Sequence, residues 1–365
     1  MIKIISFILI LFLTKINTFN EYKPVIGIYA NPEPENDVVN YNMTYVPFSY
    51  IRWLESFGAD VMIIQQWYNK SEIDEILSKI NGVLFTGGGR DFNLSSNWEK
   101  NAIYIIEKAK NDTIPVWGTC MGFQLINVLL SRNYSILVNN FNDSSIVHGI
   151  IFNDKTKSSK MYSLFDESNF HILEENTTLY FHSWGFKPEI YRTTNLTSIF
   201  NVNSIVLDSN NIEFVNSIEG INDNIKIYAT QYHPEKIPFI RNKNYKLPHE
   251  RKILKVSVLL GAFFVNEARN NKNKFNMDDR KNYYFIDNYG NTTNYYNYDS
   301  ISEVLYFAKN ETREEPKNKK KIDYLFYYIG AGILAVIITI IIIYLIFGKT
   351  KKKLQNDQIG LLREL

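Results

Sequence analysis

The stretch "PVWGTCMGFQ", residues 115–124, decides the fold, and it contains the only cysteine of a 365-residue chain. An apolar run leads through Gly118, Cys120 and Gly122 into a second apolar segment with helical spacing. This is the G-x-nucleophile-x-G pattern of a sharp strand-to-helix turn, in which the glycines leave room for neighbouring strands. The pattern predicts a nucleophile at the end of a buried strand.

A lone cysteine also has plainer interpretations. It is most often a small buried apolar residue, and in an exported protein it can bridge two chains. The flanking glycines favour a working thiol at Cys120 instead. A helix that begins at Met121 points its free N–H groups and positive dipole end at the sulfur, which predicts a lowered thiol pKa. The backbone N–H of Met121 is then also placed to stabilise an oxyanion.

Short apolar runs alternate with helical patterns on both sides of this turn. Strands are expected at 24–30, 60–65, 82–85 and 114–119, and helices at 45–58 (ending at Gly58), 71–80 (with Ser71 as N-cap), 97–111 and 121–131. Beyond residue 135, partly antiparallel strands are expected at 204–209, 212–219 and 225–233, before an amphipathic helix over 252–269. Such alternation predicts an α/β fold of flavodoxin-like type, with a mostly parallel sheet flanked by helices.

A thiol nucleophile needs a base, and "YATQYHPEK" (228–236) supplies a candidate. Pro234 holds His233 in extended geometry, so His233 and Glu235 point to the same side of a strand. A carboxylate beside an imidazole fixes its tautomer and raises its basicity. An H-x-E pair is a weak signal by itself, but with the cysteine turn it predicts a triad of Cys120, His233 and Glu235.

The stretch "LFTGGG" (84–89) ends a strand in three glycines. Gly87 or Gly88 could supply a second oxyanion donor through its backbone N–H, although three glycines also suit a plain flexible turn. The stretch is not a phosphate loop, because no G-K-[ST] follows it.

The two ends of the chain predict export and a membrane anchor. Residues 1–20 are typical of a signal peptide, and 324–347 form a run of 24 residues without a charge, long enough for a transmembrane helix. We expect a catalytic domain over 21–270, an extension and stalk over 271–321, a transmembrane helix over 322–348 and a cytosolic tail over 349–365. Ten N-x-[ST] sequons precede the apolar run, and the tail stretch Asp357–Leu362 resembles an acidic dileucine signal for sorting adaptors. Residues 1–20 carry a net charge of +2 and residues 349–365 a net charge of +3, so the rest of the chain carries −3, which excludes the basic footprint of a nucleic-acid binder.

The stretches "FTGGG", "PVWGTCMGFQ", "FHSWGF" and "QYHPEK", in this order, resemble the glutamine-amidotransferase-like superfamily. "FHSWGF" and "FFVNEARNN" make the chain more similar to the gamma-glutamyl hydrolases, over about residues 24–300. The resemblance implies Cys120 as nucleophile, His233 as base and Glu235 as orienting acid. It also implies His182 as a second active-site histidine and Tyr45 as a substrate-pocket residue.

The implied reaction is cysteine-dependent hydrolysis of gamma-glutamyl bonds in folylpoly-gamma-glutamates, without a metal or an organic cofactor. Two alternatives stay open: a glutaminase of the amidotransferase type, and a catalytically silent surface module on the same fold. A homodimer is compatible with the sequence. The expected placement is a single-pass type I membrane protein with its catalytic domain in the lumen of a lysosome, endosome or digestive vacuole. Exposure at the cell surface and release by clipping in the stalk are variants of that placement.

Overall fold

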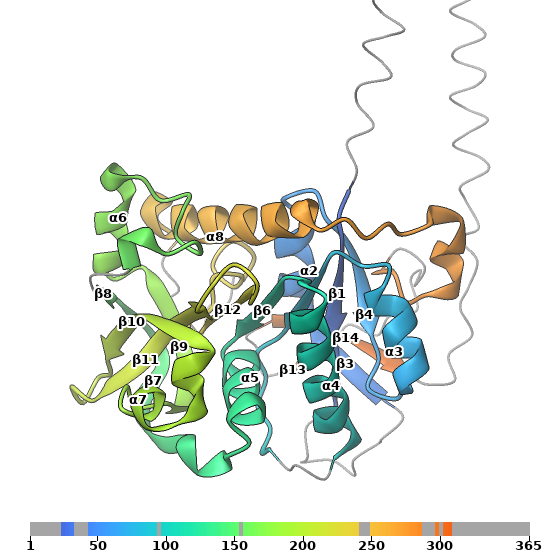
Figure 1. Cartoon of the computed structure of the whole chain (residues 1–365). Helices are drawn as coiled ribbons and strands as arrows, with labels where there is room; N and C mark the ends of the chain where they lie inside the picture. Colours follow the sequence, from blue (N-terminus) through green and yellow to red (C-terminus); the bar gives the residue numbers. More distant parts are fainter. Residues whose placement is uncertain are drawn as a thin grey trace, which may run out of the picture. The chain divides into compact units, whose positions relative to one another are not determined.

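The computed structural model describes residues 23–32, 43–92, 96–152, 156–240, 249–286, 296–298 and 302–308. All of them belong to one compact unit, Met1–Arg313. Its centre is an eight-stranded sheet with the strand order β4–β1–β5–β6–β12–β11–β10–β8 (Figure 1). In that order the strands are Asp60–Ile64, Val25–Tyr29, Gly82–Phe85, Val116–Thr119, Ile227–Thr230, Glu213–Gly220, Phe200–Leu207 and Ile151–Phe152.

Strand direction divides this sheet into two parts. The five strands from β4 to β12 pair in parallel, whereas β11, β10 and β8 continue the sheet in antiparallel fashion. The predicted α/β architecture and the antiparallel strands expected beyond residue 135 are therefore confirmed.

Helices cover both faces of the sheet, and each face has its own core (Figure 1). On one face lie α3 (Lys70–Leu77), α4 (Asn97–Asn111) and α5 (Met121–Ser131). On the other lie α2 (Phe48–Glu55) and α8 (Arg251–Asn270). The short helices α6 (Glu167–Glu174) and α7 (Ile190–Thr193) follow in the antiparallel half of the chain.

Strand β1 shows why these strands are apolar throughout. Val25 and Tyr29 belong to the core beneath α3 to α5, and Ile26 and Ile28 belong to the core beneath α2 and α8. Successive strand residues point to opposite faces, so a sheet covered on both sides buries every position. All five residues of β1 are accordingly buried.

Two smaller sheets border the centre. Strands β7 (Val138–His148) and β9 (Thr178–Gly185) form an antiparallel pair, and β2 (Asn31–Pro32), β3 (Met43–Pro47), β14 (Ser302–Ala308) and β13 (Tyr296–Tyr298) form a second sheet. Strand β14 lies within the stretch expected to be extension and stalk, yet its residues 304–308 pair with all of β3. The side chains of Phe275 and Phe285, also from that stretch, are buried against the helix-covered core.

The structure contradicts the prediction of a transmembrane helix. Across the ranges described above, no helix is both long and apolar enough to cross a membrane. The long helix α8 is packed on the sheet and carries charged residues at both ends, including Arg251, Lys252, Glu267 and Arg269. The same finding contradicts the expected placement as a single-pass type I membrane protein. The stretches 1–20, 322–348 and 349–365, which carried the predictions of signal peptide, anchor and sorting tail, lie outside the described residues.

The parallel strands place the candidate residues together. Strands β5, β6 and β12 are neighbours, with Phe85 opposite Gly118 and Thr119 opposite Thr230. The glycine turn, Cys120 and the His233 segment follow directly after these three strand ends. Carboxyl ends of parallel strands meet at one edge, where ligands bind in open α/β sheets.

Candidate active site

Cys120 occupies the turn between β6 and α5, as the glycine pattern predicts. Its backbone is strained, with φ 52° and ψ −109°, and its N–H donates to the carbonyl oxygen of Thr230 over 2.8 Å. The turn lies so close to β5 that a Cβ on Gly122 would come within 2.2 Å of the Phe85 carbonyl oxygen. The thiol is buried, with its Sγ 3.9 Å from the Phe181 carbonyl oxygen. Non-glycine residues rarely adopt positive φ, and such strain is typical of functional turns.

His233 and Glu235 form the predicted pair, but β12 ends at Thr230, so the pair lies beyond the strand instead of on it. The Nδ1 atom of His233 lies 2.8 Å from Oε1 of Glu235, and both residues are buried. His233 is fixed further by its backbone N–H, which donates to Leu179 over 2.8 Å. Because the carboxylate accepts the Nδ1 proton, the lone pair of the imidazole is on Nε2. The ring is therefore oriented by Glu235 in the tautomer that could accept a proton at Nε2.

The glycine turn after β5 brings this pair to the cysteine. A Cβ on Gly87 would lie 2.8 Å from Cε1 of His233 and 3.4 Å from Cβ of Cys120. Both side chains thus converge on the bare backbone of Gly87, where any larger residue would intrude.

The two glycines of the turn differ in their contacts. The N–H of Gly87 is already bonded to the Tyr50 hydroxyl over 2.7 Å. A Cβ on Gly88 would lie 2.7 Å from Cε of Met121 and 2.8 Å from the Tyr45 hydroxyl. Asn31 holds the turn from β2, by donating to the Thr86 hydroxyl and to the Gly87 carbonyl. Tyr45 thus lies at the turn, next to Gly88.

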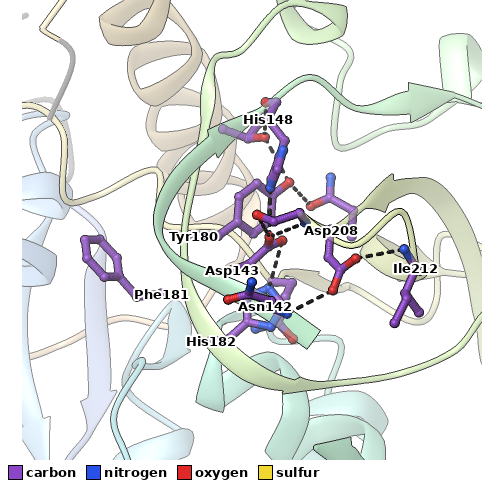
Figure 2. A network of polar contacts seen from close by, with 12 residues as sticks. Asn142, Asp143, His148, Tyr180, Phe181, His182, Asp208 and Ile212 are labelled. Carbon is purple, nitrogen blue, oxygen red and sulfur yellow. Dashed lines mark hydrogen bonds and ion pairs between the residues drawn. The ribbon is translucent and has the colours of Figure 1, made fainter. Parts of the chain in front are cut away.

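His182 comes from β9, as part of a second polar cluster (Figure 2). Its Nδ1 donates to the Trp184 carbonyl oxygen over 3.0 Å, and its Nε2 lies 4.0 Å from Oδ2 of Asp143. Figure 2 shows Asp143 between His182 and His148, and His148 Nε2 approaches Oδ1 of Asp143 to 2.9 Å. Burial lowers the pKa of His182 to about 3. The ring is therefore neutral at ordinary pH.

The predicted residues form two layers around a cavity of about 780 Å³. Gly88, Cys120, Met121 and His182 line the cavity, together with the half-exposed Trp184. Behind the thiol lie His233, Glu235 and Gly87, and Tyr45 stands beside the turn. In the described part of the chain, no group of three or more His, Cys, Asp or Glu side chains could hold a metal ion.

The charge state of the thiol differs from the expectation. Burial raises the pKa of Cys120 to about 12, against the lowering effects of Lys236 and of the Met121 N–H. Burial also lowers the pKa of His233, although Glu235 opposes this. The Met121 N–H at the N-terminus of α5 does lower the pKa of the thiol as predicted, but desolvation raises this pKa by more. Cysteine and histidine therefore rest as a neutral pair rather than as thiolate and imidazolium.

Sequence reasoning missed three residues around the thiol. Tyr50 is fully buried on α2, Lys236 is buried next to Glu235, and Gln124 donates to the Trp184 carbonyl over 2.7 Å. Lys236 and Gln124 fall inside the quoted motifs, so their position was a signal that they lie near the site. Tyr50 had no local signal, because its contacts come from residues far along the chain.

Comparison with known proteins agrees with this geometry. The family model for peptidase C26 matches residues 24–235. "Gamma-glutamyl hydrolase" of Rattus norvegicus is 32% identical over 69% of this chain and 80% of its own length. "Gamma-glutamyl hydrolase B" of Dictyostelium discoideum is 30% identical over 89% of this chain and 95% of its own length. "Gamma-glutamyl hydrolase" of Homo sapiens is 29% identical over 71% of this chain and 82% of its own length. The resemblance inferred from the motifs is thereby confirmed, and the chain belongs to the peptidase C26 family.

Proposed function

We propose that this protein is a cysteine hydrolase that cleaves gamma-glutamyl amide bonds, with folylpoly-gamma-glutamates as its substrates. The observation that carries the proposal is the convergence of Cys120 and the His233–Glu235 pair on Gly87, beside a cavity large enough for a glutamyl group. The names of the relatives and the family point to the same reaction.

In the first half of the reaction, His233 Nε2 takes the thiol proton as Cys120 Sγ attacks the gamma carbonyl carbon. The oxyanion is stabilised by the backbone N–H groups of Met121 and Gly88, since that of Gly87 is taken by Tyr50. The imidazolium then gives its proton to the leaving amine nitrogen. The C–N bond breaks and a thioester remains.

In the second half, His233 removes a proton from a water molecule that attacks the thioester. The C–S bond breaks, the gamma-carboxyl group is released, and the sulfur recovers its proton from the imidazolium. Burial opposes the charge of Glu235, but His233 and Lys236 outweigh burial and lower the pKa of this carboxyl group. Glu235 therefore remains a carboxylate and keeps the ring in the required tautomer.

The direct test is a comparison of three substrates with the purified protein. We expect release of glutamate from pteroylpenta-gamma-glutamate, measured by liquid chromatography with mass detection, and no cleavage of the alpha-linked isomer. Ammonia release from glutamine without gamma-glutamyl cleavage would instead identify a glutaminase. Tight binding of the gamma-linked chain without any product would identify a silent binding module.

The pH dependence of kcat/KM is expected to follow His233. Its pKa lies below the ordinary histidine value of 6.5, so the base stays neutral, and activity persists, at pH values where a free histidine is mostly charged. Activity falls when the pH drops through the His233 pKa. Because Glu235 raises that pKa, Glu235→Gln should move the acidic limb to lower pH. A limb that stays in place, or moves upward, would contradict the assignment of His233 as the base.

Two further proposals rest on the sequence. We propose residues 21–270 as the catalytic domain, and residues 1–20 as a signal peptide. Among the described sequons, the exposed asparagines are the candidates for glycosylation: Asn69, Asn111, Asn133, Asn142, Asn176 and Asn195.

A further inference from the structure

Tyr50 joins the two halves of the site, although it belongs to neither motif. It lies in the first turn of α2, with no exposed surface. Its hydroxyl accepts the Gly87 N–H over 2.7 Å. A Cβ on Gly87 would lie 2.8 Å from this hydroxyl and 2.8 Å from Cε1 of His233. The phenol oxygen is therefore packed between the glycine turn and the catalytic pair.

The hydrogen bond with Gly87 uses the oxygen of the Tyr50 hydroxyl and does not involve the hydroxyl proton. A backbone N–H can only donate, so the Tyr50 O–H must find an acceptor elsewhere in a fully buried site. Burial raises the pKa of the Tyr50 phenol most, and the carboxylate of Glu235 and the thiol of Cys120 raise it further, because both groups lie near the hydroxyl.

Glu235 has an atom that matches this donor. Its Oε1 is engaged by His233, while its Oε2 is buried and meets no donor at full hydrogen-bonding geometry within the described residues. A buried carboxylate oxygen without a donor is costly, so a hydrogen bond from the nearby Tyr50 hydroxyl would stabilise it.

We propose that Tyr50 is a positioning residue that ties the glycine turn to the His233–Glu235 pair, by accepting from the Gly87 N–H and donating to Oε2 of Glu235. The inference rests on the proposed hydrolase function. Tyr50 fixes the carboxylate that orients His233, and at the same time it holds the turn so that the Gly88 N–H faces the cavity. Acceptance at one end strengthens donation at the other, because hydrogen bonds in a chain polarise one another.

The variant Tyr50→Phe tests this with the smallest change of shape. We expect kcat to fall about 10- to 100-fold, as for loss of a hydrogen bond to a charged group, with KM nearly unchanged. The carboxylate that loses its phenol donor acts more strongly on His233, so the acidic limb of the pH profile should move to higher pH. Lys236, which lowers the pKa of His233, is left in place by this substitution.

Tyr191→Phe is the matched control. Its hydroxyl is equally buried and donates to Oδ1 of Asn127 over 2.6 Å, away from the cavity. It should lose comparable stability, measured by thermal unfolding, and keep the wild-type kcat and pH profile. Equal losses of kcat in both variants would show that Tyr50 is merely structural.

A double-mutant cycle with Glu235→Gln locates the coupling. If Tyr50 acts through Glu235, the double variant should be no slower than Glu235→Gln alone. Additive losses would overturn the inference, as would a Tyr50→Phe enzyme with wild-type kcat.

A readout without substrate separates this inference from the proposed function. Cys120 is the only cysteine, so the rate of iodoacetamide labelling against pH reports the cysteine–histidine pair alone. Tyr50→Phe should shift the pH profile of labelling, and Tyr191→Phe should leave it unchanged. If gamma-glutamyl chains are not cleaved by the wild type but this shift is found, the proposed function fails and the role of Tyr50 stands. An unchanged labelling profile overturns the role of Tyr50 whatever the substrate.

Discussion

Cys120→Ala is expected to lower kcat for gamma-glutamyl cleavage by about 10⁴-fold or more, because covalent catalysis has no other nucleophile to use. The only sulfur nucleophile of the chain is at this position. Alanine keeps the Cβ and is an L-residue like cysteine, so the backbone at φ 52° is no more strained than before. The midpoint of thermal unfolding should therefore stay close to that of the wild type.

The measurement is single-turnover cleavage followed by chromatography, together with substrate binding by calorimetry. The variant should still bind the gamma-linked chain, since Gly88, Met121 and His182 continue to line the cavity. Residual activity within 10-fold of the wild type would remove Cys120 from its proposed role.

Gly122→Ala is expected to have the largest effect on stability, lowering the free energy of unfolding by about 3 kcal/mol or more. The new Cβ would meet the Phe85 carbonyl oxygen at 2.2 Å, and both groups are backbone. Neither can rotate away, because β5 is held between β1 and β6 on its two edges. The clash can be relieved only by moving α5 away from the sheet.

Gly89→Ala is the matched control, since a Cβ there meets no atom within 4 Å. Its unfolding free energy should lie within about 0.5 kcal/mol of the wild type in denaturant titration. If Gly122→Ala were as stable as Gly89→Ala, the close approach of the cysteine turn to β5 would be refuted.

The sequence predicts the turn and the catalytic pair because their signals are local. Two glycines around Cys120 permit a sharp turn, and Pro234 restricts the backbone between His233 and Glu235, whatever surrounds these residues. The same holds for the parallel strands, whose apolar runs reflect burial on both faces.

Contacts between distant segments have no such signal. Tyr50 bonds to Gly87 across the fold, and nothing in the stretch around Tyr50 distinguishes it from a core aromatic residue. The strand Ser302–Ala308 is similarly defined by its partner β3 rather than by its own pattern. The thiol pKa depends on how deeply the turn is buried, which only the packed structure gives.

Even local signals can leave the first residue of a helix undecided. Ser71 was the predicted N-cap of the helix after β4, but Asn69 caps it, in a capping box with Glu72. Both residues are good caps, and the reciprocal bond from Glu72 decides between them.

The high pKa of the resting thiol has a consequence for the lifetime of the protein. Thiolates attack peroxide and disulfides, and a cysteine that stays protonated reacts with them slowly. In the mechanism that we propose, the sulfur is ionised only when a bound carbonyl is present and His233 receives the thiol proton. Because the thiol of Cys120 is then ionised only while substrate is bound, the single cysteine of the chain is protected from oxidants, and the enzyme survives oxidising surroundings between turnovers.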